Sequence, residues 1–175
     1  MDNDIKIFGT PQPAEDLETV AAQTEALRES GDLTRAKRLG RELAALSPSQ
    51  AESFGLNPER QQQLQVLMVF SGQHALRELL RPQLLAEAAI TAMNNFLINR
   101  SRAFWDTISD GSAFTQYLLA ERAQNPGDEQ ANLMGEVFAR VCGQEDNEDL
   151  KRLGTTVFHA AHELVRTKWN TESTM

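Results

Sequence analysis

The stretch PQLLAEAAITAMNNFLINR, residues 82–100, is the most apolar part of this 175-residue chain and decides its fold. Leu85 and Phe96 lie on one side of a helix built from it, and further apolar residues cover most of the remaining surface. A helix that is apolar nearly all round is usually central and buried. We therefore expect a central helix over 82–106, in which Met93 and Phe96 are almost fully buried.

The composition of the whole chain favours an all-α protein. Leucine and alanine each occur 21 times, whereas valine and isoleucine together occur 12 times, and this bias is typical of helices rather than strands. Residues 57–107 carry a net charge of +1, residues 1–56 carry −4 and residues 108–175 carry −5. We expect an irregular bundle of about seven helices whose middle segment forms the core and whose two ends are solvated.

Capping and turn residues predict where these helices begin and end. Asn57 and Pro58 suit an N-cap and a first helical position, and Gly31 suits a left-handed C-cap. The first four expected helices span 13–30, 32–46, 58–80 and 82–106. The fifth runs from about 113 to a turn at 125–128, the sixth runs from that turn to 143, and the last runs from the acidic stretch 145–149 to 169. The expected organisation is an N-terminal tail (1–12), an antiparallel helical hairpin (13–46), a linker (47–57), a bundle core (58–169) and a C-terminal tail (170–175).

The N-terminal pair carries a local resemblance. Ser30-Gly31-Asp32-Leu33, then Ala36, then the run from Ala44 to Pro48 supply a turn glycine, a small residue between paired helices and a closing proline. Residues 16–48 therefore resemble a single tetratricopeptide-like hairpin. The chain departs from that family at Thr24, Leu27 and Gly40, and no convincing second copy follows at a spacing of about 34 residues.

Several function classes lack their sequence signals. There is no phosphate-binding loop ending in Gly-Lys-Ser/Thr and no Gly-x-Ser-x-Gly turn, and without strands there is no dinucleotide crevice, so we expect no cofactor. The formal charge of −8 disfavours nucleic acid and anionic membranes as partners. Residues 1–6 lack the apolar segment of a secretory signal, and no apolar run is long enough for a membrane helix, so we expect a cytoplasmic protein. Cys142 is expected to be a small core residue.

One group of residues has the spacing of a metal site. His159, His162 and Glu163 fall within one sector of the last helix, and His74, four residues before Glu78, offers a third nitrogen if the two helices pack together. Three histidines would suit zinc. The apolar stripe divides the pair, however, since His162 lies at its edge and His159 on the polar side. We expect His74 to lie more than about 8 Å from the other two, so that no metal site forms.

A polar strip interrupts the apolar helix. Glu87, Thr91, Asn94 and Asn95 must hydrogen-bond or lie in water. They suggest either a small polar pocket completed by Arg100 or Arg102, or an interhelical hydrogen-bond network on a narrow exposed face.

These observations favour a non-enzymatic interaction module whose partner is a protein or peptide, including a second copy of the chain. The alternative is a small helical metalloprotein using His74, His159 and His162. The hairpin over 13–46 is expected to pack against the helices at 58–80 and 82–106 and to leave a groove for a basic amphipathic helix. The residues expected around that groove are Glu18, Glu25, Glu29, Leu39 and Leu43.

Overall fold

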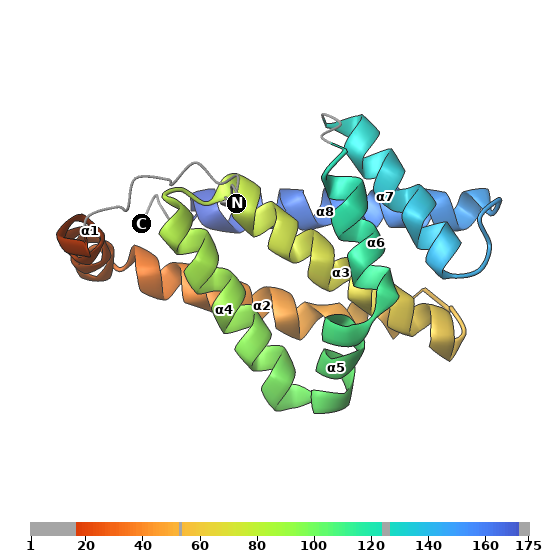
Figure 1. Ribbon diagram of the computed structural model, residues 1–175, viewed down its shortest axis with the longest axis horizontal. Helices are drawn as coiled ribbons and strands as arrows, with labels where there is room; N and C mark the ends of the chain where they lie inside the picture. Colours follow the sequence, from red (N-terminus) through yellow and green to blue (C-terminus); the bar gives the residue numbers. More distant parts are fainter. Residues whose placement is uncertain (1–16, 53, 124–126, 172–175) are drawn as a thin grey trace, which may run out of the picture.

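The computed structural model describes residues 17–52, 54–123 and 127–171, and within these ranges it is a bundle of helices without a strand (Figure 1). The helices are α1 (Leu17–Glu29), α2 (Asp32–Glu52), α3 (Pro58–Leu79), α4 (Gln83–Arg100), α5 (Arg102–Asp110), α6 (Ser112–Glu121), α7 (Asp128–Val141) and α8 (Glu148–Thr171). The prediction of an all-α bundle is confirmed. A membrane span needs a longer run of apolar residues than any helix in the described ranges offers.

Two expected helix boundaries are wrong. The helix expected over 82–106 breaks at Ser101, whose hydroxyl oxygen accepts a hydrogen bond from the backbone nitrogen of Phe104 at 3.2 Å and caps α5. A serine that caps a helix end in this way competes with continuation of the helix. At Pro48, in contrast, α2 continues to Glu52, although a proline inside a helix removes one backbone hydrogen bond and crowds the preceding turn. The first half of the expected linker is therefore helical.

Asn57 acts as the expected cap. Its side-chain oxygen accepts a hydrogen bond from the backbone nitrogen of Arg60 at 2.9 Å, and Pro58 occupies the first position of α3. The last helix also starts and ends near its expected bounds, although it runs two residues beyond Trp169. The expected N-terminal tail lies outside the described residues, as do most of the residues expected to follow the last helix.

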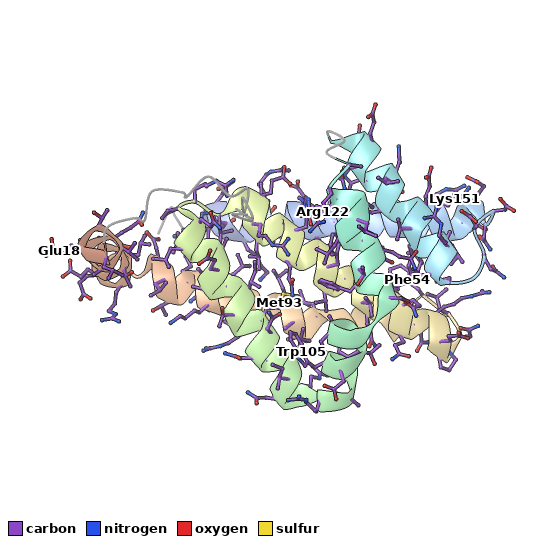
Figure 2. All side chains as sticks on the ribbon, viewed as in Figure 1. Glu18, Phe54, Met93, Trp105, Arg122 and Lys151 are labelled. Atoms are coloured by element: carbon purple, nitrogen blue, oxygen red, sulfur yellow. The ribbon has the colours of Figure 1, made fainter. Side chains whose placement is uncertain are left out.

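The centre of the bundle is α3 rather than α4. Ten residues of α3 are buried, compared with six residues of α4. In addition, α3 packs against α2, α4, α6, α7 and α8. Met93 is fully buried as predicted and lies in the middle of the molecule (Figure 2). Phe96 is only partly buried, so its predicted near-complete burial is wrong. The inward face of α4 runs through Met93 and Leu97, and Phe96 lies beside that face.

Glycines allow two helix pairs to approach closely. In α2, a Cβ at Gly40 would overlap the carbonyl oxygen of Ala89 in α4. Between α7 and α8, a Cβ at Gly154 would lie 2.9 Å from the Cα of Gly135. The second contact fixes α7 along α8, and α8 in turn packs along α3. This arrangement places one face of α8 beside α3 and the start of α7.

The two N-terminal helices differ in how they pack. The second helix, α2, packs against α3 and α4 as expected, whereas α1 buries none of its residues and lies at the left edge of the molecule (Figure 1). Leu39 and Leu43 are buried in the core and hold α2 in place. Leu43 also borders a pocket of about 290 Å³, which lies between α2, α3 and α8 and has no residue of α1 in its lining. Thus α2 docks on the central helices as expected, whereas α1 packs against α2 and contributes only partly buried residues such as Leu27. The tetratricopeptide resemblance stays a prediction.

Candidate metal site

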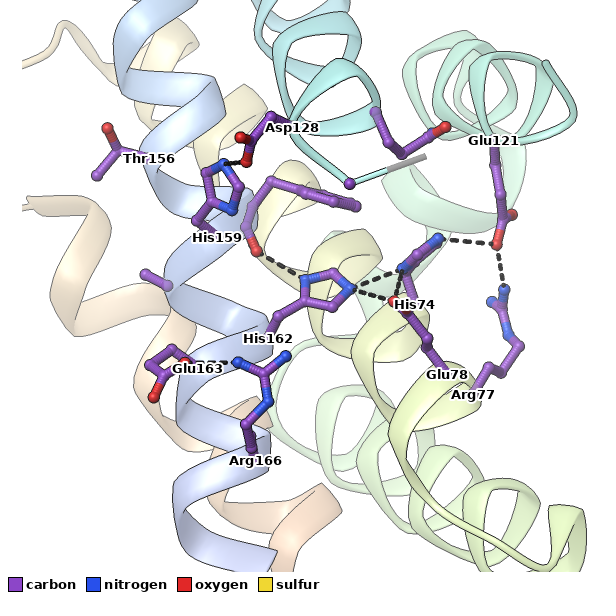
Figure 3. Close-up of a pocket in the computed structure, with 14 residues that line it drawn as sticks. His74, Arg77, Glu78, Glu121, Asp128, Thr156, His159, His162, Glu163 and Arg166 are labelled. Atoms are coloured by element: carbon purple, nitrogen blue, oxygen red, sulfur yellow. Dashed lines mark hydrogen bonds and ion pairs between the residues drawn. The ribbon is translucent and has the colours of Figure 1, made fainter. Parts of the chain in front are cut away.

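A cleft of about 1080 Å³ lies where α3 and α8 pack together, and α6 and the start of α7 close its other sides (Figure 3). Polar and charged side chains line most of it. They are His74, Arg77 and Glu78 from α3, Glu121 from α6, Asp128 and Gln130 from α7, and Thr156, His159, His162, Glu163 and Arg166 from α8.

Three potential ligand atoms meet in this cleft. His74 Nδ1 lies 2.9 Å from His162 Nε2, and Glu78 Oε2 lies 3.0 Å from the same His162 nitrogen. The third side of the triangle, from His74 Nδ1 to Glu78 Oε2, measures 3.7 Å. His74 and Glu78 are four residues apart on α3, so one helix face presents both, and α8 supplies His162 opposite them.

The hydrogen bond of its other nitrogen fixes the tautomer of His162. His162 Nδ1 lies 2.9 Å from the carbonyl oxygen of Phe158, which can only accept, so Nδ1 must carry a proton. In the neutral ring Nε2 then presents a lone pair. In a singly protonated ring that lone pair would face the carboxylate of Glu78 and the nitrogen of His74, whereas a second proton on Nε2 would be donated to Glu78. The three atoms are therefore candidate ligands for a shared cation.

His74 is also suited to bind a metal ion. Burial, reinforced by the neighbouring His162, lowers the pKa of His74 below its ordinary value, although Glu121 and Glu78 act in the opposite direction. The second nitrogen of His74, Nε2, lies 3.6 Å from Glu121 Oε1, and the same oxygen lies 3.3 Å from Arg77 Nη1. A carboxylate behind a ligating histidine is a common orienting partner in metal sites.

The expectation that His74 lies far from both histidines of α8 is wrong for His162. The two residues are 88 positions apart, and only the packing of α3 against α8 joins them. His159, the third residue of the predicted set, lies outside the triangle. Its side chain is 51% exposed and turns to Asp128, with Nε2 3.5 Å from Oδ1 (Figure 3).

Glu163 is not part of the triangle either, because it pairs with Arg166 at 2.7 Å. Glu78 supplies the third corner of the triangle instead, and its spacing of four residues from His74 is the sequence signal that points to it. Glu121 has no such signal, since it comes from a different helix.

The polar strip of α4 is divided between two environments. Glu87, Thr91 and Asn95 border a surface depression of about 570 Å³ between α2 and α4. Asn94 lies apart from it, and its side-chain oxygen accepts a hydrogen bond from Gln73 Nε2 at 2.9 Å. Arg100 and Arg102 do not line the depression. The four residues therefore do not form one pocket.

Cys142 packs against the edge of the core and is half-buried. Burial raises the pKa of its thiol to about 11. At pH 8 we expect folded protein to react with iodoacetamide at least about tenfold more slowly than urea-unfolded protein, because the thiolate is the reactive form and an unperturbed cysteine has a pKa of about 8.5. Mass spectrometry of quenched time points measures both rates. Equal rates in the two states would contradict the burial of this thiol.

A scan against protein-family models finds no family that matches this chain, and searches of the curated proteins and of the solved structures find no similar protein. The chemistry of the cleft must therefore be inferred from the geometry of the described residues.

Proposed function

We propose that this protein binds a divalent transition-metal ion, with zinc as the best fit, through His74 Nδ1, His162 Nε2 and Glu78 Oε2. The triangle of these three atoms, with sides of 2.9, 3.0 and 3.7 Å, carries the proposal. Two ligands of a tetrahedral zinc ion at 2.0–2.1 Å lie about 3.3 Å apart. The point in the plane of the three atoms that is equally far from all of them lies about 1.9 Å from each. Because zinc–ligand bonds are slightly longer, at about 2.0–2.1 Å, the ion fits slightly out of that plane.

The donor set favours zinc over the alkaline-earth ions. Calcium and magnesium take oxygen ligands, whereas two imidazoles and one carboxylate suit zinc and its first-row neighbours. The imidazole of His162 is also oriented through its second nitrogen, by the carbonyl oxygen of Phe158, and the second nitrogen of His74 lies 3.6 Å from a carboxylate oxygen of Glu121. Three protein ligands leave one position of a tetrahedral ion open toward the cleft, an arrangement common to catalytic zinc ions.

Titration of metal-free protein with zinc tests this proposal. We expect calorimetry to give one equivalent bound, and free zinc at about 100 times its dissociation constant to stabilise the fold by about 2.7 kcal/mol. Magnesium at the same concentration should leave the unfolding temperature unchanged. The protein should be purified without a nickel resin, so that its native metal content can be measured as well. Absence of stoichiometric zinc binding would overturn the proposal.

Protein–protein interaction is a second proposal, and the packing of α1 supports it. No residue of α1 is buried, Leu17 is 84% exposed, and Glu18, Glu25 and Glu29 lie on its surface. This combination suits a basic amphipathic helix as partner. A basic amphipathic peptide should bind the full chain more tightly than a variant in which these three glutamates are glutamine. Equal affinity in low salt would reject this proposal.

A further inference from the structure

The depression of about 570 Å³ between α2 and α4 carries positive charge that no acid in the described ranges neutralises. Lys37 and Arg41 are four residues apart on α2, so one face of that helix presents both to the depression. Neither side chain makes an ion pair or a hydrogen bond within the part of the chain that the structure describes. Glu87, an acid in the lining, accepts a hydrogen bond from Gln83 at 3.1 Å instead.

The opposite wall, formed by α4, combines polar and apolar side chains. Thr91, Asn95 and Asn99 follow one another at intervals of four residues along its exposed edge. Leu84 and Phe96 also line the depression and are only partly buried, so apolar surface lies open beside the two cations. A surface of this kind is complementary to a peptide segment that carries both carboxylates and large apolar side chains.

The chain itself contains such a segment. Residues 2–8, with the sequence DNDIKIF, lie outside the described ranges and hold two acids, one lysine and three large apolar residues. The carboxylates belong to Asp2 and Asp4, and the large apolar side chains are those of Ile5, Ile7 and Phe8. The segment is therefore complementary to the depression in both charge and apolar content.

The segment is also long enough to reach the depression. Leu17, the first residue of α1, comes thirteen positions after Asp4, and an extended chain of that length spans about 43 Å. Measured along α1, the turn and the first residues of α2, Leu17 lies at most about 40 Å from Lys37. Asp4 can therefore reach Lys37 whatever the angle between α1 and α2.

We propose that residues 2–8 dock in the depression between α2 and α4 of the same chain, with the two aspartates against Lys37 and Arg41. Phe8 then covers the apolar surface of α4. Single exposed ion pairs are weak, but the covalent connection holds the segment near its site at an effective concentration of about millimolar. Two ion pairs and one apolar contact therefore suffice to keep it docked.

Carbodiimide cross-linking of the full chain tests this placement, because the reagent joins a carboxylate directly to a lysine amine in contact with it. In low salt we expect a product of monomer mass in which Asp2 or Asp4 is joined to Lys37, identified by mass spectrometry. Lys151 and Glu148, whose side chains meet at 2.7 Å on α8, give a reference product in the same sample. The yield relative to this reference should fall about threefold or more in about 0.5 M salt, which screens exposed charges.

Two variants and a matched control separate docking from random encounters. Arg41→Gln removes one cation but keeps the amine that reacts, so the relative yield at Lys37 should fall about twofold or more. Phe8→Ser removes the apolar contact and should lower the yield by a similar factor. Arg122→Gln is the control, because Arg122 is an exposed arginine at the end of α6, outside the depression, and it should leave the yield unchanged.

Three results would overturn the proposal. The first is the absence of a product at Lys37 in a sample that forms the reference product. The second is an equal yield in Arg41→Gln and Arg122→Gln, which would show that the depression does not hold the segment by charge. The third is a product found only between two copies of the chain, which would place the segment of a second copy in the depression.

Discussion

Replacing His162 by alanine is expected to lower the affinity of the protein for zinc at least about a hundredfold, since changes to residues that merely orient metal ligands already cost about 10–100-fold. His162 Nε2 is the corner shared by the two shortest sides of the triangle, at 2.9 Å and 3.0 Å. Without it only His74 and Glu78 remain, and both come from α3. The variant should therefore hold a metal ion from α3 alone, while α3 and α8 stay packed together. Calorimetric titration of the metal-free variant measures the change.

Two further variants locate the site. Glu78→Gln keeps the size of the third ligand and removes its charge, so zinc affinity should fall about tenfold or more. His159→Ala is the matched control, because it removes an imidazole from the same helix and the same cleft but outside the triangle. It should change zinc affinity less than about threefold, since His159 contacts Asp128 instead. Equal losses in His159→Ala and His162→Ala would contradict the assigned ligands.

Replacing Gly40 by alanine is expected to lower the free energy of unfolding by about 3 kcal/mol or more, at the upper end of the range for overpacking. The added Cβ would overlap the backbone carbonyl oxygen of Ala89, and backbone cannot rotate aside as a side chain can. The contact between α2 and α4 must therefore open, and residues buried along it, such as Ala36 and Leu43, lose packing. Urea denaturation followed by circular dichroism measures the change.

Gly72→Ala is the control for Gly40→Ala. Gly72 is also a buried helical glycine, but a Cβ there would meet the terminal methyl of Met93 at 3.3 Å, and a methionine side chain can move. Alanine also gains about 0.5–1 kcal/mol over glycine inside a helix, which offsets the crowding. The stability of Gly72→Ala should thus stay within about 1 kcal/mol of the parent. Similar losses in both variants would indicate that close backbone approach at Gly40 is not the cause.

Local signals predicted most of the helices because the interactions that form them are local. The cap at Asn57 and the proline after it involve residues within one helical turn of each other, so the start of α3 can be predicted from sequence. The errors fall where local preference is nearly balanced. Serine is tolerated inside a helix and favoured at its N-cap, and the structure uses Ser101 as a cap. Pro48 ends many helices, yet α2 passes through it.

The candidate metal site was only partly accessible from sequence. The pair of His74 and Glu78 is visible as a spacing of four residues on one helix, and His162 is visible as a histidine at the edge of an apolar stripe. Which histidine of α8 faces α3 depends on how the two helices are rotated against each other. That rotation placed His162 in the triangle and turned His159 toward Asp128.

The sequence by itself determined that this protein is all-α, with helices that begin near capping residues and bury their leucine-rich faces, because those properties depend on composition and on contacts within a few residues. The tertiary structure alone decided that α3 is central, that α1 buries none of its residues, and that three potential ligand atoms from α3 and α8 lie within 4.8 Å of one another. The physical reason is that helix packing depends on close contacts between distant residues, such as Gly40 with Ala89 and Gly154 with Gly135. Such contacts leave no periodic pattern in the chain.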